Sequence, residues 1–106
     1  MVARYDVWLV RRDTGESAEI RKTRPAVVAS PDEMNDALQT VLMCPMTSTQ
    51  KNWPTRVATD FQGKRGEIAL DQMRTVDRKR LVKKLGELDS VTRTKFTETL
   101  LDFFAE

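Results

Sequence analysis

The chain carries its hydrophobic residues in short runs separated by polar segments, as expected of a protein built mainly from β-strands. Six runs that are rich in β-branched or aromatic residues, or that alternate between apolar and polar, predict strands. They cover residues 5–10 (YDVWLV), 25–29 (PAVVA), 40–46 (TVLMCPM), 55–60 (TRVATD), 67–73 (EIALDQM) and 81–88 (LVKKLGEL). Pro45 favours a sheet edge or a bulge near the end of the third run, because proline cannot donate to a strand ladder.

The segments between these runs predict exposed connections and short helical turns. Residues 11–22 are highly charged and predict a long exposed loop, and residues 47–54 (TSTQKNWP) predict a polar, mobile turn. Residues 61–66 (FQGKRG) predict a two-glycine turn. Pro31 can begin a short helix, since proline suits the first helical turn, and Asp77 can begin a single helical turn.

The hydrophobic period changes after Asp89 and Ser90, which are both suitable helix N-caps. Apolar side chains then recur at the spacing of one helical face, at Phe96, Leu100, Phe103 and Phe104. This pattern predicts an amphipathic C-terminal helix that closes the fold. Short strands followed by one helix predict a mainly β (α+β) fold, in which a strongly bent antiparallel sheet or small barrel forms one domain over residues 1–106.

Composition and length fit a soluble domain with a modest core. The chain has 106 residues, of which 40% are hydrophobic and 32% charged, and its mean hydropathy is −0.51. No stretch approaches the roughly 20 apolar residues that a membrane-spanning helix needs, so we expect a cytoplasmic protein without a membrane partner. Cys44, the only cysteine, is expected to be a small buried side chain.

The absence of histidine is the most informative property of the composition. It excludes histidine-based acid–base catalysis, Ser-His-Asp and Cys-His nucleophiles, and most transition-metal sites. We therefore expect neither a metal nor a cofactor. If the protein is an enzyme, its chemistry must rely on Arg, Lys, Asp, Glu, Thr, Ser or Tyr.

Positive charge is concentrated in one segment although the net charge is only +2. Residues 64–84 contain eight Lys or Arg against three acidic residues. Such an excess is compatible with a surface for a polyanion, and a solvated face remains the alternative.

Arg24 stands directly before Pro25 and the buried run that follows it. Pro25 restricts its own φ angle and biases Arg24 toward an extended backbone, which would make a stiff mount for a guanidinium. Two interpretations stay open at this point: a solvated strand end, or a cation held rigidly to act on an anion.

Four blocks carry a family resemblance: YDVWLV from Tyr5, EIRKTRPAVVAS from Glu19, CPMTS from Cys44, and LDQMRTVD from Leu70 followed by RLVKKLG from Arg80. In this order and at compatible spacing, they resemble the MazF/PemK-type (Kid-like) endoribonuclease toxins of bacterial type II toxin–antitoxin systems. The resemblance implies an SH3-like β-barrel that forms a homodimer and cleaves single-stranded RNA, including mRNA, without a metal. It also implies a MazE-like acidic antitoxin that blocks the same surface.

The resemblance implies catalytic roles for Arg24, Thr47 and Glu19. Arg24 would stabilise charge on the transition state. Thr47 would hydrogen-bond a phosphate oxygen, or alternatively cap its own turn. Glu19 is favoured over Asp71 for proton handling, although a carboxylate of ordinary pKa is a weak base at neutral pH. One branch of the family carries His and Arg where this chain has Ala18 and Ala69, so that branch's acid–base scheme does not carry over.

Further RNA contacts are predicted at Lys22, Ser48, Trp53, Asp71, Gln72 and Arg74. Trp53 can stack a base, or alternatively fill a barrel end or a dimer contact, and Gln72 can contact a base edge. Trp8 is expected to pack in the core or at a dimer seam. Residues 78–84 can hold RNA or the antitoxin, or form a solvated strand. Two rival functions remain: a non-catalytic SH3-like binding module, and a toxin of the same fold directed at gyrase.

Overall fold

The computed structural model describes residues 1–12 and 22–105, and within them it contains seven strands and two helices. The strands are β1 (Asp6–Arg11), β2 (Thr23–Val28), β3 (Thr40–Thr47), β4 (Arg56–Phe61), β5 (Lys64–Ala69), β6 (Arg74–Asp77) and β7 (Leu81–Glu87). The helices are α1 (Asp32–Ala37) and α2 (Ser90–Phe104), and two 3₁₀ turns span Leu70–Gln72 and Arg78–Arg80. Most of the charged loop predicted over residues 11–22 lies outside the described residues.

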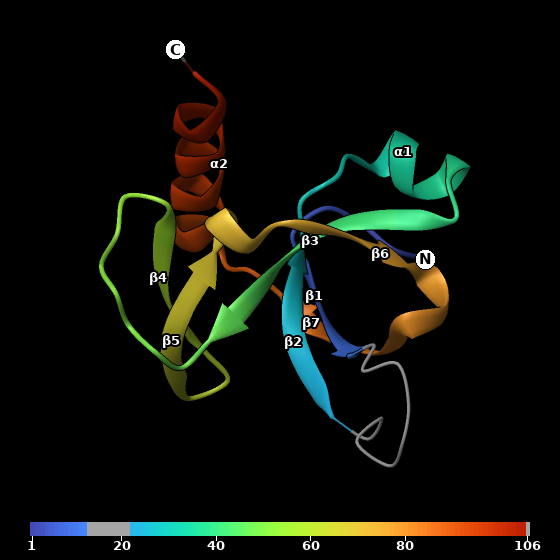
Figure 1. The fold of residues 1–106 in the computed structure, drawn as a ribbon, viewed down its shortest axis with the longest axis horizontal. Helices are drawn as coiled ribbons and strands as arrows, with labels where there is room; N and C mark the ends of the chain where they lie inside the picture. The colour runs from blue at the N-terminus through green and yellow to red at the C-terminus, as the bar shows by residue number, and fades with distance from the viewer. Residues whose placement is uncertain (13–21, 106) are drawn as a thin grey trace.

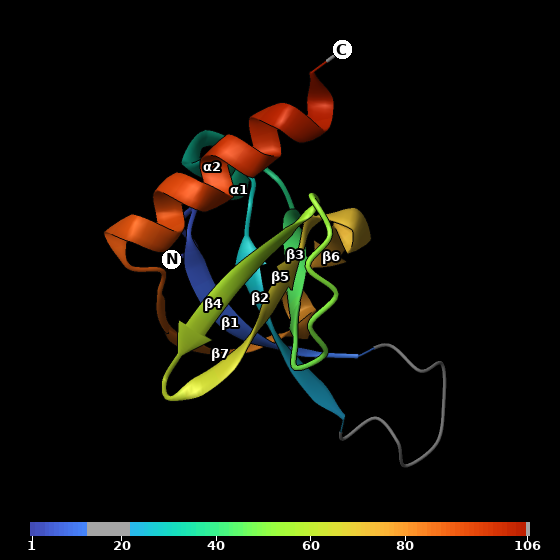
Figure 2. The same cartoon turned by 90° about the vertical axis from the view of Figure 1, so that its left-hand side faces the viewer.

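The strands form one strongly bent antiparallel sheet in the order β4-β5-β3-β2-β1-β7, with β6 paired to β3 beside this path. Strand β3 organises the bend, because its first half pairs with β6 and its last two residues, Met46 and Thr47, pair with β5. Both helices lie at the same end of the sheet (Figures 1 and 2). The predicted mainly β fold with a bent sheet and a C-terminal helix is therefore confirmed.

Pro45 lies inside the sheet, whereas the sequence favoured a sheet edge or a bulge. The carbonyl of Leu42 accepts a hydrogen bond from Ala29 N on the β2 side (2.8 Å), so backbone alternation turns position 45 to the opposite side of β3. On that side the ladder with β6 ends at Met43 and the ladder with β5 begins at Met46. Pro45 thus falls between two ladders, where its missing N–H leaves no strand partner unsatisfied.

The second half of strand β2 is buried on both faces and separates two hydrophobic clusters. Val27 and Ala29 belong to the cluster beneath α2, whereas Ala26 and Val28 belong to the second cluster, against which Trp8 packs. Cys44 is fully buried in the first cluster, as predicted, and burial raises the pKa of its thiol to about 12. A strand fixed on both faces is a rigid support for whatever side chains it carries at its exposed start.

The β4–β5 hairpin is tighter than the sequence predicted. Its turn consists of Gln62 and Gly63 alone, both with positive φ (51° and 79°), as a two-residue type I′ hairpin requires. Gly66, expected in the turn, lies inside β5.

Strand β5 ends at Ala69, so Asp71 and Gln72 lie in a 3₁₀ turn and not in a strand. The short strand β6 was not predicted.

Helix α2 begins as predicted, because the Asp89 carboxylate accepts a hydrogen bond from Thr92 N (2.8 Å). Phe96 is fully buried, and Leu100 packs partly buried against the first cluster. The predicted inward positions Phe103 and Phe104 are 40% and 69% exposed, so this part of the prediction was wrong. The last turn of α2 extends beyond the sheet that its first turns cover (Figure 1). Neither described helix has the length and apolarity to cross a membrane.

Candidate active site

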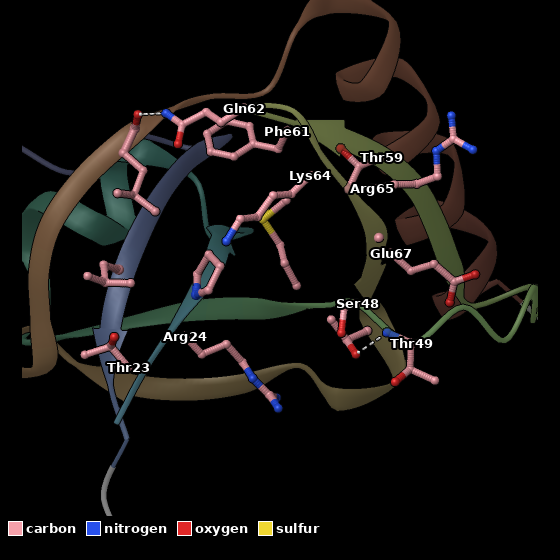
Figure 3. A pocket seen from close by; sticks show the side chains of 16 residues that line it. Thr23, Arg24, Ser48, Thr49, Thr59, Phe61, Gln62, Lys64, Arg65 and Glu67 are labelled. Atoms are coloured by element: carbon pink, nitrogen blue, oxygen red, sulfur yellow. Dashed lines mark hydrogen bonds between the residues drawn. The ribbon is translucent and has the colours of Figure 1, made fainter. Parts of the chain in front are cut away.

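A pocket of about 570 Å³ opens where the start of β2, the end of β3 and the β4–β5 hairpin converge. These three segments lie at the end of the sheet away from the helices (Figures 1 and 2). The pocket brings together three predicted site residues, Arg24, Thr47 and Ser48. Its polar lining also includes Thr49, Lys64 and Arg65, which the sequence did not single out. We call this cavity the basic pocket (Figure 3).

Strand β2 carries Arg24 near its start, so the arginine lies within the strand and not before it as predicted. On one side Arg24 pairs with Val10 of β1. On the other side the ladder to β3 covers only Ala26 to Val28. Continuing that register by two residues would set Arg24 opposite Thr47, but the two strands have no paired residues there. The space between the two diverging strands belongs to the basic pocket.

The Arg24 guanidinium lies among positive charges. The pKa of Arg24 is lowered by partial burial, and further by the charges of Arg12 and Arg74. In the described part of the chain it makes no ion pair. A half-buried cation repelled by two others gains stability when an anion binds, so its electrostatics favour an anionic ligand. Arg74 was predicted to contact substrate; it does not line the basic pocket, but its charge acts on Arg24.

Thr47 ends β3 and forms the turn that leads out of it. Its Oγ1 accepts a hydrogen bond from Thr49 N (3.1 Å), which is the turn-capping role left open by the sequence. A hydroxyl that accepts one bond still has its proton to donate, so capping and contact with a phosphate oxygen are compatible. The turn is held close to β5, because a Cβ added at Gly66 would clash with the carbonyl oxygen of Thr47.

The β4–β5 hairpin forms the wall of the basic pocket that faces β2. Figure 3 shows the side chain of Lys64 reaching from this hairpin into the cavity. The Gln62 side chain donates from Nε2 to the carbonyl oxygen of Leu85 in β7 (2.8 Å), which fixes the hairpin to the far edge of the sheet. Phe61, Met46 and other apolar residues line the same cavity. The pocket thus has an apolar part beside its cations.

The other predicted site residues lie outside the basic pocket. Lys22 is exposed just before β2, and Gln72 is exposed in the 3₁₀ turn. Trp53 is 48% exposed in the β3–β4 loop, where the cations of Lys51 and Arg56 lie 5.3 and 4.9 Å from its ring centroid. Glu19 lies outside the described residues.

Asp71 is engaged by a neighbouring arginine. Its Oδ1 accepts from Arg56 Nε (2.7 Å) and from Thr55 Oγ1 (3.0 Å), and its Oδ2 accepts from Arg56 Nη2 (3.3 Å). The hydrogen bond from Arg56 is the main cause that lowers the pKa of Asp71, which makes this carboxylate a poorer proton acceptor at neutral pH. The geometry therefore weakens the case for Asp71 as the general base.

Glu67 was not predicted to be functional, yet it organises the loop beside the pocket. Its carboxylate is buried and accepts from Lys51 N (3.0 Å), Asn52 N (2.9 Å) and Arg56 Nη1 (3.3 Å). Burial alone would raise the pKa of Glu67, but these donors outweigh it and lower the pKa. We call Arg56, Glu67 and Asp71 the tether. It fixes a loop that the sequence predicted to be mobile.

No group of three or more His, Cys, Asp or Glu side chains is placed to hold a metal ion within residues 1–12 and 22–105.

A curled antiparallel sheet with a cationic pocket beside a threonine turn defines the chain as a small β-protein suited to bind an anion. Residues 3–104 match the family model of the PemK-like, MazF-like toxins of type II toxin–antitoxin systems. The chain belongs to this toxin family.

Solved structures of similar fold cover almost the whole chain. An endoribonuclease in complex with its cognate antitoxin, from Mycobacterial species, has a TM-score of 0.79 at 23% identity, over 96% of this chain and 93% of that one. A MazE–MazF crystal structure from Deinococcus radiodurans gives a TM-score of 0.75 at 28% identity, over 99% of this chain and 95% of that one. Another endoribonuclease from Mycobacterial species has a TM-score of 0.77 at 24% identity, over 95% of this chain and 88% of that one.

Proposed function

We propose that this toxin is a sequence-specific, metal-independent endoribonuclease that cleaves single-stranded RNA and is neutralised by a cognate antitoxin. The observation that carries the proposal is the basic pocket, where Arg24 and Thr47 lie across one cavity from Lys64. The mycobacterial protein of similar fold, which is an endoribonuclease, supports the same activity.

The lining of the basic pocket fits one nucleotide and its phosphate. Cations and hydroxyls suit the phosphate, while Phe61 and Met46 offer an apolar surface for a base. Arg24 would present two donors to the phosphate oxygens, and Thr47 would donate its hydroxyl proton to one of them. RNA is favoured over DNA as substrate because the ribose 2′-OH supplies the nucleophile.

In the proposed reaction the 2′-oxygen attacks the adjacent phosphorus. The 2′-O–P bond forms and the P–O5′ bond breaks, which leaves a 2′,3′-cyclic phosphate and a 5′-OH. Glu19 is the proposed acceptor of the 2′-OH proton. The alternative, Asp71, is hydrogen-bonded by Arg56 and has a lowered pKa.

The decisive test is cleavage of a mixed-sequence single-stranded RNA in EDTA, with the Arg24→Ala variant beside the wild type. We expect the wild type to produce cyclic-phosphate and 5′-OH ends and the variant to leave the RNA nearly intact. Intact RNA with the wild type, or equal cleavage by both proteins, would refute the mechanism. Inhibition of gyrase with the RNA untouched would favour the gyrase-directed alternative, and binding without cleavage the non-catalytic one.

The proposed antitoxin segment is acidic and competes with RNA for the basic pocket, because the same cations attract phosphates and carboxylates. Similar toxins have been solved in complexes with antitoxins. An RNA with a 2′-O-methyl group at the mapped cut site would bind without being cleaved. The acidic segment should displace it; simultaneous binding with no mutual weakening would contradict the shared surface.

We also propose that the toxin forms a homodimer through an apolar surface between α1 and α2. Met34, Leu101 and Phe104 are 43%, 67% and 69% exposed there, and they line an apolar cavity of about 270 Å³. Light scattering should give twice the chain mass for the wild type and a lower mass for Leu101→Lys. A monomeric wild type would exclude the dimer, and an unchanged mass for the variant would exclude this surface.

A further inference from the structure

The proposed cleavage leaves one proton unaccounted for. When the P–O5′ bond breaks, the 5′-oxygen departs as an alkoxide unless an acid protonates it, and alkoxides are poor leaving groups in water. In the proposed reaction Arg24 and Thr47 stabilise the charge on the phosphate, and Glu19 accepts the proton of the 2′-OH. The inference that follows rests on this proposed function and concerns the group that protonates the leaving oxygen.

The described lining of the basic pocket offers few groups that can donate this proton. Guanidinium groups such as Arg24 and Arg65 hold their protons too tightly to act as acids. The carboxylate of Glu67 is turned away from the cavity and is occupied by two backbone amides and Arg56 (Figure 3). Lys64 is the remaining titratable side chain among these described lining residues, and ammonium groups carry a transferable proton at neutral pH.

Lys64 is also well positioned. It is the first residue of β5, pairs with Phe61 across the two-residue turn, and points into the cavity from the wall opposite β2 (Figure 3). The hairpin that carries it is braced by the bond from Gln62 to Leu85 and by the close packing of Phe61 on Gly86. Arg24 is mounted on β2, so a phosphate between the two walls would have Arg24 on one side and Lys64 on the other.

We propose that Lys64 is the general acid of the RNA cleavage. As the 2′-O–P bond forms and the P–O5′ bond breaks, the Lys64 ammonium transfers one proton to the departing 5′-oxygen. The products at this end are a neutral amine and a free 5′-OH, and the amine regains its proton from water before the next turnover.

The test compares two leaving groups in the same short RNA, which carries the linkage mapped by sequencing the 5′ ends of cleaved RNA. One oligonucleotide has the natural 5′-oxygen and the other has sulfur at this bridging position. A thiolate leaves without a proton, so the sulfur substrate does not need a general acid. Lys64→Arg keeps the positive charge but cannot donate its proton readily, and Lys95→Arg on the exposed face of α2 is the matched control.

We expect Lys64→Arg to cleave the natural RNA about 100-fold or more slowly than the wild type, the size typical of general acid catalysis. On the sulfur substrate the cleavage rate of Lys64→Arg should be within a few-fold of the wild-type rate. Lys95→Arg should cleave both substrates at the wild-type rate. Circular dichroism and thermal unfolding verify that Lys64→Arg is folded.

Three outcomes would overturn the inference. Equal loss on both substrates would mean that Lys64 acts through binding or charge alone, and unchanged cleavage of the natural RNA would mean that another group supplies the proton. In both cases the wild type still cleaves RNA, so the proposed function survives. If the wild type yields no cleaved RNA in the mapping step, the proposed function fails, and the role of Lys64 fails with it.

Discussion

The basic pocket and the tether are built from the same kinds of charged side chain, but they use them in opposite ways. In the tether, Arg56 is surrounded by the carboxylates of Glu67 and Asp71, at 3.3 and 2.7 Å. In the basic pocket, Arg24 has other arginines as its charged neighbours, and they lower its pKa together with burial. One region pairs its charges internally, while Arg24 makes no ion pair with the described residues.

The same difference appears in the pKa values of the two arginines. The pKa of Arg56 is raised, chiefly by the hydrogen bond to Asp71, so the folded protein stabilises its charge. The lowered pKa of Arg24 means that the fold disfavours its charge. A charge that the fold itself disfavours is a reasonable indication of a binding or catalytic site, because a bound anion would relieve the cost.

The largest expected effect comes from Arg24→Ala. Cleavage of RNA should fall by about 10²–10³-fold, because one preorganised donor group to the transition state is lost. The free energy of unfolding should stay the same or rise slightly, since the substitution removes a repelled cation. Initial rates and urea denaturation measure the two quantities.

Arg24→Lys serves as the control for charge, and it should recover only part of the rate because an ammonium lacks the two-pronged geometry of a guanidinium. A variant Arg24→Ala that is clearly less stable than the wild type would remove the contrast between the two regions.

Glu67→Gln should have the opposite profile, with its main effect on stability. An amide cannot accept from two backbone N–H groups and pair with Arg56 as a carboxylate does, so we expect a loss of about 2 kcal/mol in urea denaturation. Glu87→Gln is the matched control, because Glu87 also pairs with cations but is 53% exposed, and it should cost well under 1 kcal/mol. Equal losses for the two variants would show that the tether is no stronger than a surface pair.

A smaller effect is expected when the pH changes. Glu67 and Asp71 both have pKa values lowered in the folded state, so their contribution to stability is present above the unfolded values, roughly pH 4–4.5, and is lost as the pH falls through the folded values. The gap in unfolding free energy between the wild type and Asp71→Asn should therefore shrink as the pH is lowered from about 7 to about 3.5. A gap that widens in acid would contradict these pKa shifts.

Much of the fold could be predicted from the sequence because most of its strands have a recognisable local pattern. The runs at residues 5–10, 25–29 and 40–46 are apolar and β-branched, and they became β1, β2 and β3 within a few residues. Strand β6 was missed because it has only four residues, of which Val76 alone is buried, so no alternation was visible. The last turn of α2 was misjudged because periodicity shows that a face is apolar but not what covers it.

The site was predictable in part for a related reason. Arg24 and Thr47 were predicted through the resemblance, and in the structure both line one pocket. Glu67 and Arg56 were not found, since the sequence does not show that β5 sends a carboxylate to a loop 15 residues earlier, at Asn52. Lys64 was counted in the predicted turn at residues 61–66 and in the basic segment 64–84, but it was not among the predicted site residues.

The contact between Gly66 and the Thr47 carbonyl oxygen has a consequence for how this pocket can diversify. Because two backbones set that spacing, the distance between the Thr47 turn and β5 is fixed by the absence of a side chain at Gly66. Hairpin residues that line the pocket, other than the proposed general acid Lys64, could therefore vary while the Thr47 turn keeps its distance from β5. Gly66 thus holds the Thr47 turn against β5, whichever side chains line the rest of the pocket.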